Sequence, residues 1–203
     1  AELTAAGLAG PGARPLHSLT HDALVKASPA LDALIQETMR LYPTAATSAS
    51  RVTTDPSGTP LGPYTLPPGI VIWAPQYLLH NSTSLWDNPS TFKPERWLGP
   101  EGAAAQYAKP GAGTARSGTD NGAPSGNGGE QQQYKRYMPF GEGIKNCVGQ
   151  AYGQALVRTL VGGLLSRLRF SLPPGFTSPE RGNVVVAITT KMAALQLDVT
   201  PRE

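Results

Sequence analysis

The chain reads Phe140-Gly141-Glu142-Gly143-Ile144-Lys145-Asn146-Cys147-Val148-Gly149 immediately before a long segment of helical periodicity. The glycines allow tight turns and let the backbone approach a flat ligand closely. Cys147 stands at the expected N-terminus of that helix, where the helix dipole favours a thiolate. These residues therefore predict a tight loop that presents Cys147 as a candidate ligand to iron.

Two other kinds of site use loops of this type, and the residues fit neither of them well. A phosphate-binding loop would end in Gly-Lys-Ser/Thr, which is missing here. A catalytic cysteine needs a positioned histidine, and none of the chain's three histidines, His17, His21 and His80, has a readable partnership with Cys147. Because Cys147 is the single cysteine, an internal disulfide and a Cys-rich zinc site are excluded. A buried, unreactive thiol remains the alternative to specific chemistry.

The composition bounds the class of protein. A chain of 203 residues is long enough for one domain, and its 23 Gly, 20 Pro and only 15% charged residues predict a fold rich in loops. The 17 basic and 14 acidic residues form no long like-charge run, which gives little support to nucleic-acid binding. No segment is apolar enough to predict a membrane span, and no signal pattern precedes the helices. The absence of an initiator Met at Ala1 suggests an incomplete chain.

Helical periodicity predicts two long helices. The first begins at Ser28, which can cap it, with Pro29 in the first turn, and it ends at Tyr42 before Pro43. The second runs from about residue 146 to 168 and contains small residues that allow tight packing. A short helix is expected over 75–79. Residues 1–27 are interpreted as a partial N-terminal segment that is poorly packed.

The remaining ordered segments predict small antiparallel sheets. Extended pieces over 51–54, 64–66 and 70–73 are separated by Pro and Gly, and alternation over 184–188 and 195–199 suggests a closing hairpin. A Gly/Ala/Ser/Asn/Gln-rich segment at about 99–133 cannot bury enough apolar surface to offset its ordering entropy, so it predicts a disordered insertion. The expected fold is mainly α with small antiparallel β-sheets (α+β), formed by residues 28–203 around this insertion.

The loop resembles the haem loop of the cytochrome P450 family, Phe-x-x-Gly-x-Arg-x-Cys-x-Gly, with Phe140, Gly143, Cys147 and Gly149 in register. Lys145 stands where the family usually has Arg. Lysine keeps the positive charge that would contact a haem propionate, but it loses the bidentate fork of a guanidinium. The resemblance implies that Cys147 is the axial thiolate and that Gly141 also belongs to the haem-binding loop.

Two further segments match the family in the same order along the chain. Glu37-Thr38-Met39-Arg40 is similar to the Glu-x-x-Arg of the family's K helix, and Phe92-Lys93-Pro94-Glu95-Arg96-Trp97 is similar to its Pro-Glu-Arg-Phe segment. The resemblance therefore implies a structural triad of Glu37, Arg40 and Arg96. It also implies that Arg51 contacts a haem propionate. His80 matches a histidine that family members often carry, and we assign it no catalytic role.

What the resemblance implies about function is a haem-thiolate monooxygenase, here as the C-terminal part of the fold. The cofactor would be haem b, and the substrate a small lipophilic organic molecule, for which the small side chains of 44–49, in a segment that lines the family's substrate pocket, would leave room above the haem. Electrons would come from an NADPH-dependent reductase or a ferredoxin at a basic surface formed by Lys135, Arg136 and Lys145. The full-length protein would reside in the endoplasmic reticulum or another organelle membrane.

Two alternatives to an enzyme stay open at this point. One is a non-catalytic fragment or interaction module that keeps the family's signature without haem. The other is a self-contained haem protein whose missing wall comes from a partner chain. As given, the chain is expected to bind haem poorly and to be inactive by itself.

Overall fold

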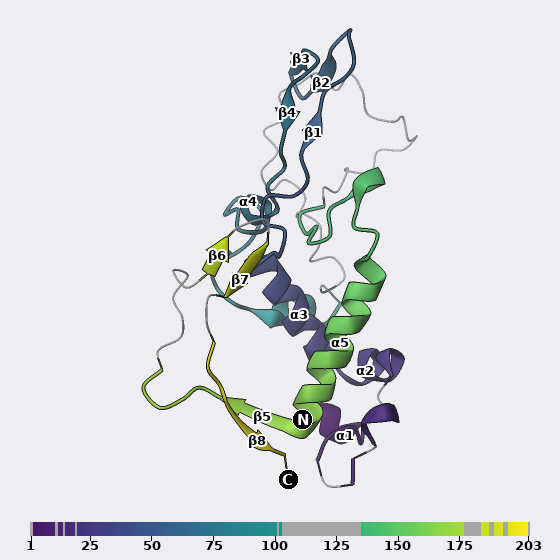
Figure 1. Cartoon of the computed structure of the whole chain (residues 1–203), viewed down its shortest axis with the longest axis vertical. Helices are drawn as coiled ribbons and strands as arrows, with labels where there is room; N and C mark the ends of the chain where they lie inside the picture. Colours follow the sequence, from purple (N-terminus) through teal and green to yellow (C-terminus); the bar gives the residue numbers. More distant parts are fainter. Residues whose placement is uncertain are drawn as a thin grey trace.

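The computed structural model describes residues 2–10, 12–13, 15–18, 20–100, 102, 135–176, 184–186, 189–192 and 195–202. Two helices, α3 (Pro29–Leu41) and α5 (Gln150–Arg167), lie side by side at its centre (Figure 1). An ion pair between Asp32 of α3 and Arg158 of α5 joins them. These helices and the small antiparallel sheets described below confirm the expected α+β fold class.

The local sequence explains where α3 begins and ends. The hydroxyl of Ser28 accepts a hydrogen bond from the Leu31 N–H at 3.3 Å, and Pro29 occupies the first turn, where its missing N–H costs nothing. The helix stops at Leu41, one residue before the Tyr42-Pro43 pair that disfavours further helix. The prediction of a helix between Ser28 and Tyr42 is confirmed.

Helix α5 begins later than the sequence indicates. It starts at Gln150, not near Asn146, because residues 143–145 form the 3-10 turn η4 (Gly143–Lys145) and Asn146 is extended with ψ 163°. Gly162 lies where α5 meets its neighbours: a Cβ there would come within 2.8 Å of Leu24 and 3.2 Å of Leu31. A side chain at position 162 would therefore force these helices apart.

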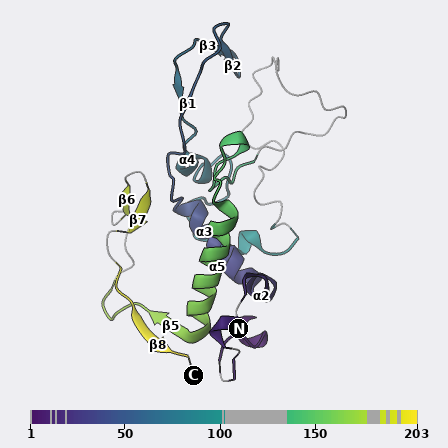
Figure 2. The same cartoon turned by 45° about the vertical axis from the view of Figure 1, so that its right-hand side comes forward.

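The N-terminal residues form short helices at one end of the molecule. They are α1 (Glu2–Ala5), the 3-10 turn η1 (Leu16–Ser18) and α2 (His21–Ala27), of which α2 contacts α5. Leu8 and Leu24 are buried together. Figure 2 shows α2 beside α5 from a second direction. The domain boundary expected at residue 28 stays a prediction.

An arm of two small antiparallel sheets projects from the other end of the molecule (Figures 1 and 2). In one sheet β1 (Arg51–Val52) pairs with β4 (Val71–Ile72), and in the other β2 (Thr59–Leu61) pairs with β3 (Tyr64–Leu66). The arm returns to the body through α4 (Gln76–His80), close to the short helix expected over 75–79. The sequence does not predict strand β2, because Pro60 lies within it and proline is uncommon inside strands.

The C-terminal pairing differs from the expected hairpin. Strand β6 (Val184–Val186) pairs with β7 (Thr190–Met192), whereas β8 (Asp198–Pro201) pairs with β5 (Leu168–Ser171) directly after α5. Segments 184–188 and 195–199 are therefore not partners, and that prediction is wrong. Alternation of apolar and polar residues identifies a strand, but it does not identify the neighbour to which the strand bonds. The insertion expected at about 99–133 lies outside the described residues, apart from 99, 100 and 102.

Candidate functional site

A cavity of about 750 Å³ lies between α3, α5 and the loop that precedes α5. Leu34, Ile35, Thr38 and Met39 of α3 face it from one side, and Gly153, Val157 and Val161 of α5 from another. The small residues Thr44, Ala45, Ser48 and Ala49 also line it, in the segment expected to leave room for a substrate. The lining is thus mostly apolar with a few hydroxyl groups, which is typical of cofactor and ligand pockets.

The 140–149 loop closes on itself through main-chain hydrogen bonds. The Cys147 N–H donates to the Phe140 carbonyl at 2.8 Å, and the Gln150 N–H at the start of α5 donates to the Cys147 carbonyl at 3.2 Å. Gly141 and Gly143 have φ of +77° and +73°, in the left-handed region that side chains other than glycine rarely adopt. These glycines are therefore required by the turn, and the turn fixes the main chain of Cys147.

The structure brings four of the expected haem-site residues to the cavity wall: Phe140, Gly141, Lys145 and Cys147. The Cys147 thiol is exposed, so the alternative of a buried, inert thiol is wrong. Gly143 and Gly149 shape the loop without being among the described residues that line the cavity. Their roles toward a cofactor stay predictions.

Arg51 is not among the described residues that line the cavity. It is exposed at the start of β1, and its guanidinium donates to the carbonyls of Ala49 and Ser50, each at 3.1 Å. Its acceptor Ala49 does line the cavity. A propionate contact from Arg51 would need its side chain to leave these carbonyls, and it stays a prediction.

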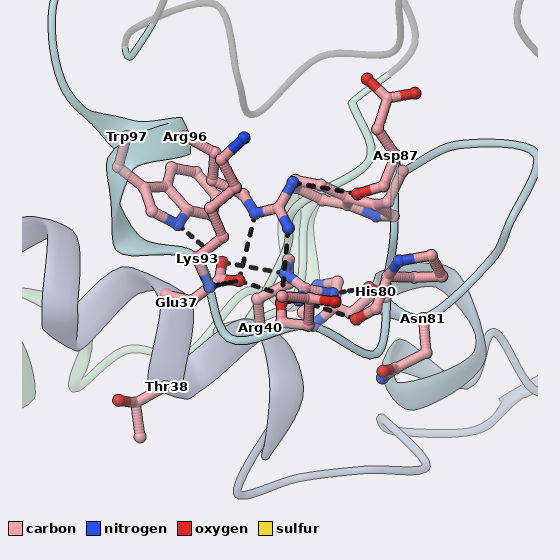
Figure 3. Close-up of polar contacts among 12 residues, drawn as sticks. Glu37, Thr38, Arg40, His80, Asn81, Asp87, Lys93, Arg96 and Trp97 are labelled. Atoms are coloured by element: carbon pink, nitrogen blue, oxygen red, sulfur yellow. Dashed lines mark hydrogen bonds and ion pairs between the residues drawn. The ribbon is translucent and has the colours of Figure 1, made fainter.

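Glu37, Arg40 and Arg96 meet in a buried network behind the cavity (Figure 3). The Glu37 carboxylate accepts two bonds from Arg40, at 2.9 and 3.0 Å, and one from Arg96 Nε at 3.1 Å. Glu37 and Arg40 are fully buried. The structure thus brings together the three residues expected to form a triad.

The same carboxylate has two partners that sequence reasoning missed. Trp97 Nε1–H donates to Glu37 Oε2 at 2.9 Å, and the Lys93 main-chain N–H donates to Oε1 at 2.9 Å. Burial by itself would raise the pKa of Glu37, but the bonds from Arg40, Lys93 and Trp97 outweigh it and lower the pKa below its usual value. A partner for Trp97 could have been expected from the sequence, because a buried indole N–H needs an acceptor.

Arg40 extends the network by donating hydrogen bonds to main-chain carbonyls farther along the chain. Its guanidinium donates to the carbonyls of His80 at 2.7 Å, Pro89 at 2.8 Å and Thr91 at 3.3 Å. One side chain of α3 therefore holds the end of α4 and the segment around residue 90. Charge-assisted bonds of this kind are about twice as strong as neutral ones.

Arg136 does not contribute to a basic surface. It is buried, its guanidinium lies 4.1 Å from the centroid of the Trp86 ring, and it donates to the Leu85 carbonyl. Of the three cations expected at a partner surface, Lys145 is exposed and Lys135 is half-buried and paired with Glu142 at 2.5 Å. The expectation that all three form such a surface is wrong for Arg136. A buried arginine beside tryptophan is a packing element.

A sequence model of the family described as Cytochrome P450 matches residues 15–196. A cytochrome P450 of Caenorhabditis elegans, cyp-13B1, is 30% identical over 173 residues, covering 85% of this chain and 28% of that protein. The cytochrome P450 monooxygenase asqL of Emericella nidulans is 31% identical over 144 residues, covering 71% of this chain and 24% of that protein. The chain spans about a quarter of the length of these relatives.

Two solved structures have the same fold over most of this chain. The crystal structure of the cytochrome P450 CYP102L1 matches with a TM-score of 0.65 at 22% identity, over 89% of this chain and 33% of that one. A mutant heme domain of cytochrome P450DA matches with a TM-score of 0.68 at 18% identity, over 97% and 35%. Together with the family match, they show that this chain belongs to the cytochrome P450 family and has part of its fold.

Proposed function

We propose that this chain forms the thiolate side of a haem-thiolate monooxygenase site, in which the Cys147 thiolate would hold the haem iron. The observation that carries the proposal is the place of the chain's single thiol, which is exposed at the wall of a largely apolar cavity of about 750 Å³. Such a volume lies within the range of roughly 300–1,000 Å³ that small-molecule and cofactor sites occupy.

The residues present fit the chemistry of haem b. A flat macrocycle needs apolar side chains along its faces, and Phe140, Val157 and Val161 supply them. Gly141 has no side chain to hinder its approach, and the Lys145 ammonium can neutralise a propionate. Haem bound through a thiolate would supply oxygen activation, in which the thiolate donates electron density that favours O–O cleavage.

The chain's own residues have three tasks in this proposal. The closed loop fixes the place of Cys147, the apolar lining excludes water, and the Glu37 network holds the surrounding segments behind the cavity. The chain spans about a quarter of its relatives' length, so we propose the activity of the whole protein and do not assign it to this chain alone. The whole protein would act on a lipophilic organic substrate, receive electrons from a reductase or a ferredoxin, and lie at an organelle membrane. No described helix is long and apolar enough to cross a membrane.

The test of the proposed function is a haem titration of the purified chain, followed by absorbance. We expect saturation at one haem per chain, with an affinity weaker than that of complete family members. Cys147→Ala should change the ferric Soret band and weaken binding further, whereas Ser48→Ala, on the same cavity wall, should keep the spectrum of the original chain. Failure to saturate, or a spectrum that Cys147→Ala leaves unchanged, would contradict the proposal.

Lys145 offers a prediction about charge in the same titration. Lys145→Gln should raise the dissociation constant for haem a few-fold, because an exposed ion pair contributes on the order of 0.2–1 kcal/mol. Lys145→Arg should keep or improve affinity, and salt should reduce the difference between the Gln variant and the original chain. Lys93→Gln, an exposed lysine outside the cavity lining, is the matched control. Equal dissociation constants for the Gln variant and the original chain at low salt would remove Lys145 from the haem site.

A further inference from the structure

His80 connects the Glu37 network to the segment that leads into the Cys147 loop. It is the last residue of α4, it is fully buried, and its ring lies 5.3 Å from the ring of Tyr137, measured between centroids. Its carbonyl accepts the 2.7 Å bond from Arg40, and Figure 3 shows the two residues side by side. His80 Nε2 accepts a hydrogen bond from the Met138 main-chain N–H at 2.9 Å.

Main-chain hydrogen bonds continue from Met138 to the cysteine. The Met138 carbonyl accepts from the Gly141 N–H at 3.0 Å, which closes the turn over residues 138–141. The Phe140 carbonyl, within this turn, accepts the 2.8 Å bond from the Cys147 N–H. Two linked main-chain turns therefore connect Met138 to Cys147, so a shift of Met138 would also move the main chain of Cys147.

The bond to Met138 requires a neutral imidazole, because only an unprotonated Nε2 can accept. The ring proton is thus assigned to Nδ1. Nδ1 makes no hydrogen bond with the residues that the structure describes. Burial of the ring, and then the nearby charge of Arg40, lower the pKa of His80 and so disfavour a second proton, which would destroy the acceptor.

We propose that His80 is a positioning residue for Cys147: its Nε2 anchors Met138 and so sets the conformation of the loop over residues 138–147. The inference goes beyond the proposed function and rests on it only where Cys147 is taken as the iron ligand. The anchoring itself is a property of the chain without cofactor. It can therefore be tested without haem, and its failure is distinguishable from failure of the haem titration.

Two variants distinguish the effect of the His80 hydrogen-bond acceptor from the effect of the volume that its ring fills. In His80→Gln the side-chain carbonyl oxygen lies as many bonds from Cα as Nε2 does, so the acceptor is kept. In His80→Phe a ring of similar size remains, but the Met138 N–H loses its partner. The measurement is amide hydrogen exchange of the 203-residue chain, compared for residues 138–147, for α3 and for α5.

We expect His80→Phe to speed exchange over residues 138–147 by about tenfold or more, as the loss of a buried acceptor implies, and to change α3 and α5 much less. His80→Gln should restore the original protection. Unchanged exchange over 138–147 in the Phe variant overturns the proposal. Equal acceleration in all three regions also overturns it, since that result marks a purely structural core residue. If the Phe variant does not fold, the Gln variant tests the proposal by itself. Exchange over residues 138–147 as slow as in the original chain supports the role of His80 as an anchor for Met138, and faster exchange there refutes it.

Discussion

Glu37→Ala should lower the free energy of unfolding by about 3–5 kcal/mol, the cost of breaking a buried ion pair from one side. The substitution leaves the Arg40 guanidinium fully buried without its carboxylate, and it takes the acceptor away from the Trp97 and Lys93 N–H groups. Folded domains are stable by only about 5–15 kcal/mol, so this loss would be a large share of the total. Urea denaturation followed by tryptophan fluorescence measures the loss, because Trp86 and Trp97 are both buried.

A matched control is available in the same part of the chain. Glu95 is exposed on the 3-10 turn η2 (Pro94–Trp97), beside the arginine that contacts Glu37. Glu95→Ala should change the free energy of unfolding by no more than about 0.5 kcal/mol, as is usual for surface substitutions. A loss below about 1 kcal/mol for Glu37→Ala would show that the buried network does not hold the fold together.

Acid should destabilise the chain through His80, beginning at a higher pH than the protonation of carboxylates. Burial, and then the charge of Arg40, lower the pKa of His80 from 6.5 to about 4. The unfolded chain therefore binds a proton between these values that the folded chain does not, so stability is complete above pH 6.5 and falls as the pH approaches 4. The difference corresponds to about 3 kcal/mol. From about pH 4.5 downward the lowered pKa of Glu37 acts in the same direction.

The measurement is the free energy of unfolding in denaturant at several values between pH 7.5 and about pH 4. His80→Gln should remove most of the decline above pH 4.5, because glutamine has no proton to gain. His17→Gln is a control, since His17 is exposed and lies outside the buried network. Parallel declines in the original chain and in His80→Gln would show that His80 is not a buried neutral group.

The local parts of the fold were predictable because single residues determine them. Ser28 and Pro29 mark the start of α3, and Gly141 and Gly143 mark the turns of the loop, whatever the rest of the chain does. The Glu37–Arg40 spacing also places both side chains on one side of a helix. The start of α5 was harder to locate, because residues 143–149 have the composition of a helix end but fold as a 3-10 turn and an extended residue.

Contacts between distant segments were predictable only through the family resemblance. Arg96 was assigned to Glu37 in this way, but the Lys93 N–H and the Trp97 indole were not, because a main-chain donor leaves no signal in the sequence. The burial of Arg136 under Trp86 and the pairing of β8 with β5 depend on tertiary packing in the same sense. His80 was recognised as a family feature, but its bond to Met138 was visible only in the structure.

The central claim is that Cys147 is a thiolate ligand to haem iron, and the carbon monoxide difference spectrum of the reduced, haem-loaded chain tests it most directly. A thiolate opposite carbon monoxide gives a red-shifted Soret band that imidazole or water ligation does not. We predict this band for the original chain and for Ser48→Ala, and its complete loss in Cys147→Ala. A haem-loaded chain without the band, or a band that survives in Cys147→Ala, would contradict the claim.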